Sequence, residues 1–335
     1  RGCELEPFER AFPAYCGARH SIGVDNWLDA LAIVLRALGV EDGDEVIVPG
    51  HTFIATWLAV TLAGGVPRPV DVDDRTMNLS PACLDAAITD RTRVVMPVHM
   101  HGLPADMERI CAISRAHGAR VVEDAAQAHG ATIHGRRAGS LADAAAFSFY
   151  PTKNLGGLGD AGCIVTDDDD LAERVRLLRN YGSRRKYHHE VQGGNSRLDE
   201  IQAAFLRVKL ARLDEWNARR RLVAERYLAA FADLPDLRVP EVPPGYEHVW
   251  HVFPLRCTGR DELQRRLADR GIGTLVHYPV PVHRSPAYAP TVGAVDLPVT
   301  DSISATELSL PMGPHLALAD VDRVIAAIRE LVGAA

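Results

Sequence analysis

The sequence predicts an α/β protein in which a large domain, with a mostly parallel mixed sheet covered by helices, precedes a smaller C-terminal α+β domain. Along the first two-thirds of the 335 residues, short apolar runs typical of strands alternate with segments of helical periodicity. The runs are almost continuously apolar, as expected of strands buried on both faces of a sheet. After Thr166 this alternation stops, and a long helical stretch leads into a more varied C-terminal part.

The regular structure of the large domain is expected to begin with a helix over residues 26–38. Asp25 is suited to cap its first N–H groups, and Gly39 favours the left-handed conformation that ends a helix. Apolar runs predict the strands, at residues 45–48, 68–72, 93–98, 120–123, 144–149 and 162–166. Helical periodicity predicts the helices between them, at residues 54–63, 81–88 and 105–117.

Beyond these strands the sequence predicts helices at residues 171–178 and from about 198 to 231, separated by a charged, irregular loop at 181–195. The proline-rich segment 234–244 is the expected link between two domains, residues 1–233 and 234–335. In the second domain we expect a strand at 251–256 and helices at 261–271 and 319–331. The acidic run 167–170 is interpreted as the cap of the helix that follows it, in preference to a metal site.

Composition and charge exclude several classes of protein. The chain has 47% apolar and 24% charged residues, which is ordinary for a globular protein, and its net charge of -7 argues against a nucleic-acid surface. No apolar run approaches the ~20 residues that span a bilayer. The six cysteines are scattered without a C-x-x-C pair, which indicates reduced thiols and no zinc site. We therefore expect a cytoplasmic protein that binds neither nucleic acid nor membranes.

The most informative segment is residues 147–162, in which Lys153 lies on a tight turn between two apolar strands and is followed by four glycines. A lysine amine forms a Schiff base with an aldehyde when it is held partly deprotonated. Ser148 could hydrogen-bond a phosphate oxygen, and the glycines allow a backbone to approach a flat ligand closely. Together these features favour a lysine that holds pyridoxal phosphate covalently.

Residues 157–162 also match G-x-G-x-x-G, the pattern of dinucleotide-binding loops. That pattern requires a helix to open at its end, so that the helix N-terminus faces a pyrophosphate. Here residues 163–166 have the character of a strand. We therefore reject a nicotinamide cofactor.

Other candidate site residues follow predicted strands. Asp124 ends a strand, where a carboxylate could pair with a protonated pyridine nitrogen, and its neighbour Glu123 should point to the opposite side. Phe53 could stack on a cofactor ring or simply belong to the core. The helix that opens near Trp27 and Leu28 offers free N–H groups to an anion.

A pair of histidines raises the question of a metal site. His99 and His101 follow a strand, and alternation along an extended chain would place both imidazoles on one face. No third ligand is identifiable nearby in the sequence, so hydrogen-bonded pocket histidines are favoured over a metal site. No metal is expected.

On residues 123–130, 148–155 and 194–203, and on motifs that extend from residue 4 to residue 311, the chain resembles the DegT/DnrJ/EryC1/StrS sugar aminotransferases. These are pyridoxal-phosphate enzymes of fold type I. The resemblance implies that Lys153 forms the Schiff base, Asp124 pairs with the pyridinium nitrogen and Gln127 approaches the ring hydroxyl. It also implies that Phe53 covers the ring, that Ser148 and the backbone at Trp27 and Leu28 hold the phosphate, and that Asn195 reaches the phosphate of the neighbouring subunit in a homodimer with shared active sites.

The motifs at residues 179–187 and 277–283 look most like the branch that acts on thymidine-diphosphate-linked 3-keto-6-deoxyhexoses. The resemblance implies that L-glutamate donates the amino group and leaves as 2-oxoglutarate, in deoxyaminosugar biosynthesis. Tyr181, Lys186, Tyr187 and His283 are the implied substrate contacts. The chain departs from the family at Trp27, where glycine is usual, at His101, where tyrosine is common, and in starting at a motif that relatives reach after another helix-sized segment.

Other functions on the same fold stay open. A nucleotide-sugar 4-aminotransferase would use the same cofactor residues, because few contacts set the position of amination. A dehydratase of the family would carry histidine in place of Lys153, so the lysine argues against it. A non-catalytic regulatory protein that binds the cofactor is suggested by Trp27 and by the short N-terminal part.

Overall fold

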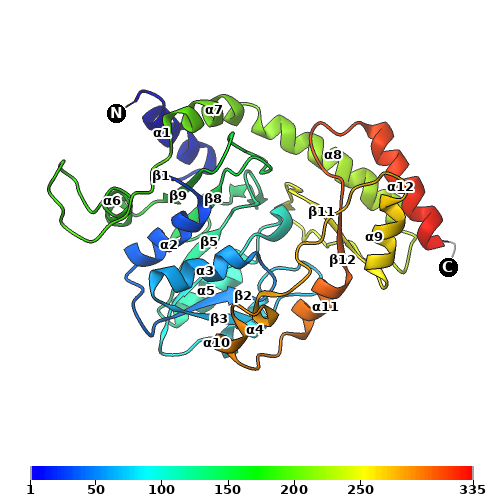
Figure 1. Cartoon of the computed structure of the whole chain (residues 1–335), viewed down its shortest axis with the longest axis horizontal. Helices are drawn as coiled ribbons and strands as arrows, with labels where there is room; N and C mark the ends of the chain where they lie inside the picture. The colour runs from blue at the N-terminus through cyan, green and yellow to red at the C-terminus, as the bar shows by residue number, and fades with distance from the viewer. Residues whose placement is uncertain (1, 334–335) are drawn as a thin grey trace.

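The computed structural model describes residues 2–333, and its centre is a seven-stranded sheet in the order β1-β9-β8-β5-β4-β2-β3 (Figure 1). The strands β8, β5, β4, β2 and β3 run parallel, whereas β9 is antiparallel to both of its neighbours. The sheet is therefore mixed and mostly parallel, as predicted. Its strands are β1 (His20–Val24), β2 (Glu45–Pro49), β3 (Val66–Val70), β4 (Thr92–Val95), β5 (Arg120–Asp124), β8 (Ala144–Ser148) and β9 (Gly162–Thr166).

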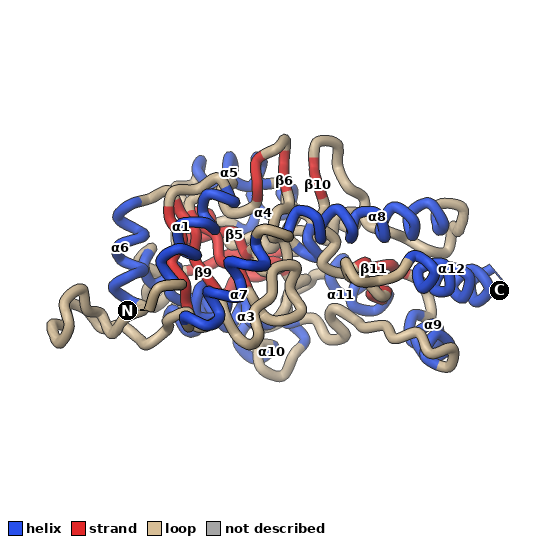
Figure 2. Tube along the Cα trace, turned by 90° about the horizontal axis from the view of Figure 1, so that it is seen from above, coloured by secondary structure: helices blue, strands red, loops and turns tan. Residues whose placement is uncertain are grey.

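Helices cover both faces of this sheet, as the layers in Figure 2 show. One apolar core lies between the sheet and three helices, α2 (Trp27–Ala37), α3 (Ile54–Ala63) and α6 (Asp169–Leu178). The other core lies between the opposite face and four helices, α1 (Leu5–Cys16), α4 (Pro81–Ala87), α5 (Met107–Ala116) and α7 (Glu200–Leu210). Burial on both faces explains why the strands are apolar at nearly every position.

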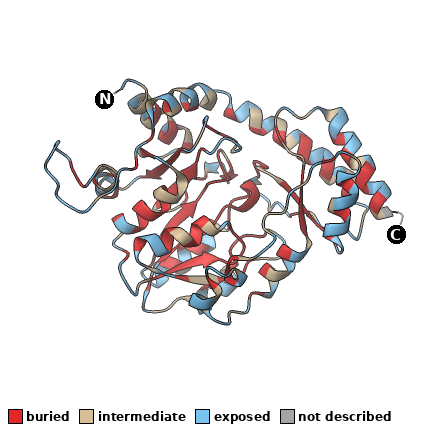
Figure 3. Cartoon of the chain, in the orientation of Figure 1, coloured by how far each residue is buried: buried red, intermediate tan, exposed pale blue. Residues whose placement is uncertain are grey.

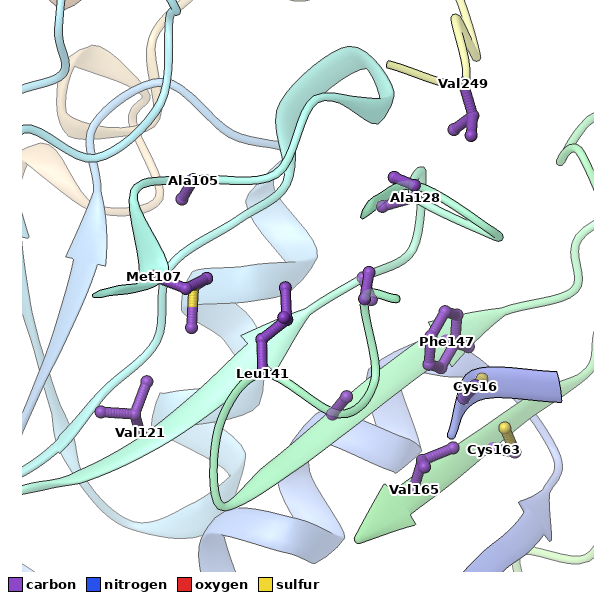
Figure 4. Close-up of a cluster of buried hydrophobic side chains, with 14 of the residues drawn as sticks. Cys16, Ala105, Met107, Val121, Ala128, Leu141, Phe147, Cys163, Val165 and Val249 are labelled. Atoms are coloured by element: carbon purple, nitrogen blue, oxygen red, sulfur yellow. The ribbon is translucent and has the colours of Figure 1, made fainter. Parts of the chain in front are cut away.

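Strand β8 shows how the two cores divide one strand. Ala144 and Ala146 face the core under α2, and Ala145 and Phe147 face the other core. On that side Phe147 lies near Cys16, Cys163 and other apolar side chains (Figure 4). Side chains that alternate in this way leave only the strand end, at Ser148, free to contribute to a site at the edge of the sheet.

The C-terminal part packs on a third core, beside the long helix α8 (Leu213–Phe231). Figure 3 shows α8 and α12 with their buried faces turned toward this core. The other elements of this part are β11 (Phe253–Arg256), α9 (Arg260–Ala268), η2 (Val282–Arg284), α10 (Ala289–Val292), α11 (Pro298–Thr306), β12 (Glu307–Leu310) and α12 (Leu318–Gly333). Three short strands, β6 (Thr132–Ile133), β7 (Arg136–Arg137) and β10 (Tyr246–Glu247), form a separate small sheet. The domain boundary at residue 233 stays a prediction.

Several local predictions differ from the structure. The first helix is capped by Asn26, whose Oδ1 accepts a hydrogen bond of 2.9 Å from the amide of Asp29, and not by Asp25. The helix predicted from about 198 to 231 is two helices, α7 and α8, although no glycine or proline marks the break between them. Leu206 of α7 and Leu213 of α8 pack in the core that lies between the sheet and helices α1, α4, α5 and α7, whereas the later residues of α8 pack in the third core. Tertiary packing thus overrides a helical pattern that is locally continuous.

The helix α1 and the strand β1 were absent from the predicted elements. Phe8 and Phe12 of α1 are fully buried, and β1 pairs with β9 along its whole length. Within residues 2–333, none of the helices has the length and apolar character needed to cross a lipid bilayer.

Candidate active site

Two adjacent carboxylates at the end of β5 point to opposite sides, as predicted. Glu123 accepts hydrogen bonds from the backbone amides of Gly139, Leu141 and Ala142 and lies 2.9 Å from His99 Nε2. Its role is therefore structural. Asp124 is directed to the other side, at the carboxyl edge of the parallel strands, where such sheets place their ligands.

The carboxylate of Asp124 is fully buried and held by two donors. The Thr56 hydroxyl donates to Oδ2 at 2.9 Å, and the amide of Ala126 donates to Oδ1 at 3.2 Å. Burial raises the pKa of Asp124 to about 6, although both hydrogen bonds and the charge of Lys153 act in the opposite direction. A cationic N–H placed against this carboxylate would return it to the ionised state. Asp124 is thus suited to a protonated ring nitrogen.

Lys153 lies on the turn after β8, where its amide donates to the carbonyl of Tyr150 at 2.9 Å. Burial lowers the pKa of the Lys153 amine to about 8, and the charge of Asp124 opposes that change. A substantial fraction of the amine is therefore neutral near physiological pH, as a nucleophile or a general base requires. The structure brings the two residues predicted to be catalytic into one site.

Three aromatic rings line the site next to this pair. The Trp27 and Phe53 rings are stacked with centroids 6.2 Å apart, and the Tyr278 ring lies 5.4 Å from Phe53. The Trp27 ring is also 6.0 Å from Lys153 Nζ. Phe53 is 45% exposed, so it is not a core residue and its ring is open to a flat ligand.

The predicted phosphate-binding residues come together through Gly162. Ser148, at the end of β8, is paired with Gly162 of β9, and a Cβ on Gly162 would lie 2.6 Å from the Asn26 carbonyl carbon and 2.8 Å from the Trp27 amide nitrogen. Only glycine allows the N-terminus of α2 to approach so closely. The amides of Trp27 and Leu28 belong to the first turn of α2, whose N–H groups have no helical partner. The Trp27 indole stacks on Phe53, so this side chain does not displace the backbone amide of Trp27 from the first turn of α2.

The orientation of Gln127 follows from its backbone partner. Its Oε1 accepts a hydrogen bond of 2.6 Å from the amide of His101, which can only donate. The NH2 group of the Gln127 amide, which carries two hydrogens to donate, then points away from the His101 amide. Gln127 therefore presents a donor to the site, as a contact with a ring oxygen would require.

The predicted substrate contacts lie elsewhere in the single chain. Tyr181, Lys186 and Tyr187 are exposed on the loop after α6, which projects from the edge of the molecule beside α6 (Figure 1). The same loop carries the exposed Asn195, which was predicted to reach the phosphate of the neighbouring subunit. Tyr187 is 80% exposed, and the Lys186 amine lies 5.0 Å from its ring centroid. His283 is buried, with its Nε2 3.1 Å from Asp301. The structure does not bring these residues together with Lys153.

The two candidate metal-binding histidines diverge. Residues 100–102 form the short helix η1 (Met100–Gly102), in which His101 has a φ of 59°, so the expected extended alternation does not hold there. His99 accepts a hydrogen bond of 3.1 Å from the amide of Ala105 at Nδ1 and contacts Glu123 at Nε2. Across the described part of the chain, no group of three or more side chains is arranged to hold a metal ion. The preference for hydrogen-bonded histidines is confirmed for His99.

Two further interpretations of the sequence are confirmed. Asp168 caps α6 by accepting a hydrogen bond of 3.0 Å from the amide of Leu171. Residues 162–166 form the strand β9, so no helix opens at the end of the glycine pattern.

Four residues of the site were not predicted from the sequence: Thr52, Thr56, His277 and Tyr278. The hydroxyl oxygens of Thr52 and Thr56 lie 2.7 Å apart. Because the Thr56 hydroxyl donates its proton to Asp124, the Thr52 hydroxyl must donate to Thr56. Their four-residue spacing at the start of a helix is a possible signal, but an apolar helix offers many equivalent positions. His277 and Tyr278 come from the C-terminal part, and only the tertiary structure shows that they reach the site.

Comparison with known proteins agrees with this site. Residues 1–329 match the profile of the DegT/DnrJ/EryC1/StrS aminotransferase family. The chain is 54% identical over 332 residues to a dTDP-3-amino-3,4,6-trideoxy-alpha-D-glucose transaminase of Streptomyces venezuelae, covering 98% of this chain and 87% of the relative. It is also 54% identical over 329 residues to the erythromycin biosynthesis sensory transduction protein EryC1 of Saccharopolyspora erythraea, covering 98% and 90%.

Solved structures give the same result. The crystal structure of S. venezuelae DesV in complex with a ketimine intermediate superposes with a TM-score of 0.97 at 53% identity, covering 99% of this chain and 90% of that one. NtdA of Bacillus subtilis, solved with the cofactor PMP, superposes with a TM-score of 0.94 at 33% identity, covering 99% and 78%.

Proposed function

Because this chain belongs to the DegT/DnrJ/EryC1/StrS aminotransferase family, we propose that it transfers an amino group from L-glutamate to the keto carbon of a thymidine-diphosphate-linked 3-keto-6-deoxyhexose. The enzyme is a pyridoxal-phosphate-dependent sugar aminotransferase. The observation that carries the proposal is the placement of the partly neutral Lys153 amine and the buried Asp124 carboxylate in one site, where the charge of each acts on the pKa of the other, beside the open N-terminus of α2. The position of amination rests on relatives whose names specify 3-amino sugars.

The site residues fit the cofactor group by group. The N-terminus of α2 and Ser148 would hold the phosphate dianion, because their donors converge around Gly162. Asp124 would accept a hydrogen bond from the ring nitrogen, Gln127 would donate to the ring oxygen, and Phe53 would cover one face of the ring. Lys153 would hold the cofactor covalently through Nζ.

The chemistry is divided between the cofactor and the protein. Pyridoxal phosphate, when bound, draws electrons from the carbon that loses or gains the amino group. The Asp124 carboxylate would stabilise a positive charge on the ring nitrogen and so strengthen this electron withdrawal. Once the amino donor has displaced it from the cofactor, the Lys153 amine, with its lowered pKa, would accept a proton and later return it.

We infer that the working unit is a homodimer with shared sites. On α7 the side chains of Ile201, Phe205 and Val208 are 64%, 41% and 68% exposed, and their spacing places them on one face. This face follows directly on the loop that carries Asn195. A second copy seated on α7 would cover apolar surface and bring a neighbouring loop, with Tyr181, Lys186, Tyr187 and Asn195, toward the site.

The decisive experiment supplies purified protein with glutamate and either the 3-keto or the 4-keto form of a thymidine-diphosphate sugar, and identifies the product by NMR. Amination of the 3-keto sugar supports the proposal, with 2-oxoglutarate released in equal amount. Exclusive amination of the 4-keto sugar would replace it by the 4-aminotransferase function. Lys153→Ala is the control, because it retains the fold but lacks the amine.

A regulatory role without catalysis is the second candidate. It is favoured by one observation, the 54% identity to a protein whose name describes sensory transduction. Bleaching of the cofactor's visible absorption band by glutamate, restored by a keto sugar, would reject this candidate. A band that glutamate leaves unchanged would support it.

A further inference from the structure

A buried carboxylate in the C-terminal part is not used by the proposed mechanism. Glu307 is the first residue of β12 and is fully buried. Its Oε2 accepts a hydrogen bond of 2.7 Å from the amide of His277, and its Oε1 accepts one of 2.6 Å from the Ser309 hydroxyl. Arg260 contacts the Glu307 backbone carbonyl instead, and within residues 2–333 no arginine or lysine forms an ion pair with this carboxylate.

The Ser309 hydroxyl connects Glu307 to the ring of His277. The distance from Ser309 Oγ to His277 Nδ1 is 2.8 Å. Burial raises the pKa of Glu307 to about 7, so above this pH the carboxylate is ionised and can only accept. Because the Ser309 hydroxyl has one proton, it then donates that proton to Glu307. Ser309 Oγ then meets Nδ1 as an acceptor, and Nδ1 must carry a hydrogen. Because a neutral imidazole has a single N–H, Nε2 of His277 has a free lone pair.

The His277 ring lies beside the residues of the active site. The His277 ring lies 5.5 Å from the Tyr278 ring, which in turn lies 5.4 Å from Phe53. Burial lowers the pKa of His277 to about 4, with a further contribution from the charge of Lys153, so the ring is neutral in the working range. The hydrogen bond at Nδ1 is the only one that the ring forms within the described residues.

We propose that Glu307 is a positioning residue which, through Ser309, keeps His277 in its Nδ1–H tautomer, so that Nε2 accepts a hydrogen bond from a hydroxyl group of the sugar substrate. The identity of the ligand rests on the proposed function, whereas the tautomer does not. Glu307 itself does not contact the substrate.

The variant Glu307→Gln tests the tautomer because it should reverse the chain of hydrogen bonds. The glutamine oxygen must accept from the His277 amide, which can only donate, so its NH2 group faces Ser309 Oγ. Ser309 then accepts from the glutamine and donates to Nδ1. His277 is forced into the Nε2–H tautomer, and Nε2 changes from a hydrogen-bond acceptor to a donor.

The tautomer can be determined without substrate from the 15N chemical shifts of 15N-histidine-labelled protein. The pH should be about 8.5, where a carboxyl group is ionised even if its pKa is moderately raised. The His277 signals are assigned by their loss in His277→Gln. Wild-type protein should show a protonated Nδ1 and Glu307→Gln a protonated Nε2. Glu45→Gln is the control, because it alters a buried carboxylate at the start of β2, the end of that strand that is away from the active site. It should leave the His277 signals unchanged.

An unchanged Nδ1–H tautomer in Glu307→Gln would overturn the proposal. If that variant fails to fold, Ser309→Ala serves instead, because it removes the acceptor for Nδ1–H and should allow the Nε2–H tautomer to appear. Ser309→Thr keeps a hydroxyl and should restore the wild-type signals. Retention of the Nδ1–H tautomer in Ser309→Ala would likewise overturn the proposal.

The kinetic test separates the two substrates. In Glu307→Gln, kcat/KM for the keto sugar should fall about three- to tenfold, the effect of one net hydrogen bond, while the reaction with glutamate stays within about twofold. When the sugar hydroxyl is replaced by fluorine, which cannot donate a hydrogen bond, the difference in kcat/KM between Glu307→Gln and the wild type should become smaller. An equal loss with both substrates would show a merely structural role. Failure to aminate any 3-keto sugar would overturn the proposed function and leave the tautomer result standing.

Discussion

At the scale of single residues, Lys153 is the side chain whose behaviour the structure changes most. Its amine has a pKa lowered to about 8, first because of burial, with Asp124 opposing the change. Only the neutral amine attacks an aldehyde. The rate of reaction with pyridoxal phosphate should therefore follow the neutral fraction of this one amine.

We predict that apoprotein binds pyridoxal phosphate covalently with a rate that rises about tenfold per pH unit below pH 8 and levels off above it. The rate is measured by stopped-flow absorption of the visible band that accompanies binding. Lys153→Arg should develop no such band. A rate that continues to rise up to about pH 10 would show that the lysine has the pKa of an exposed amine.

Thr56 is the residue that keeps the Asp124 carboxylate ionised most directly. We predict that Thr56→Val, which preserves shape but removes the donor to Oδ2, weakens cofactor affinity about three- to tenfold. The loss arises because the pKa of Asp124 rises further and its charge is less available to the ring nitrogen. Equilibrium dialysis of the cofactor measures the effect.

Thr61→Val is the matched control on the same helix. The Thr61 hydroxyl contacts Tyr288 and a backbone carbonyl, and has no contact with Asp124. Its substitution should leave cofactor affinity unchanged. Equal effects of the two variants would contradict the role given to Thr56.

At the scale of elements, α7 shows an apolar face that the single chain leaves uncovered. We predict that Phe205→Glu combined with Val208→Glu converts a dimer into monomers, because two charges would be buried in the interface. Light scattering after size-exclusion chromatography gives the mass directly. Leu62→Glu, at an exposed position of α3, should leave the dimer intact. A wild-type monomer at micromolar concentration would contradict the shared site.

The elements also show where prediction from sequence succeeded and failed. The apolar strands β2, β5, β8 and β9 were predicted because burial on both faces leaves a continuous pattern. The short strands β6, β7 and β10 have two residues each, too few for a periodic pattern. The break between α7 and α8 has no local signal, since it follows from packing against two different cores.

At the scale of the whole molecule, Asp74 joins the N-terminal part to the C-terminal sheet. Its carboxylate accepts hydrogen bonds from Arg256, which is buried on β11, and from Arg238. Burial acts to raise the pKa of Asp74, but the two arginines outweigh it, so the net pKa is lowered. A carboxyl with a lowered pKa in the folded state stabilises the protein at neutral pH, and this contribution is lost as the pH falls through the folded pKa.

We predict that Asp74→Asn lowers the free energy of unfolding by about 1–3 kcal/mol at pH 7, because the buried Arg256 loses its ionised partner. Denaturant unfolding measures the effect, which should shrink as the pH falls below about 4, the pKa of an ordinary aspartate, toward the lowered pKa of Asp74 in the folded protein. Asp322→Asn, which breaks an exposed pair with Arg226, should cost at most about 1 kcal/mol. If the wild type and Asp74→Asn still differed in free energy of unfolding at low pH, the effect would not be electrostatic.

The sequence by itself determined the fold class, the strand that ends at Asp124, and the lysine turn, because burial periodicity and a reactive residue on a glycine-rich turn are local properties. It also carried the family resemblance that pointed to pyridoxal phosphate. Only the tertiary structure decided that Trp27 stacks on Phe53, and that Thr56 and Tyr278 complete the site. These contacts join residues that are 26, 68 and 225 positions apart in the chain, and their geometry depends on how the cores pack, which no local pattern records.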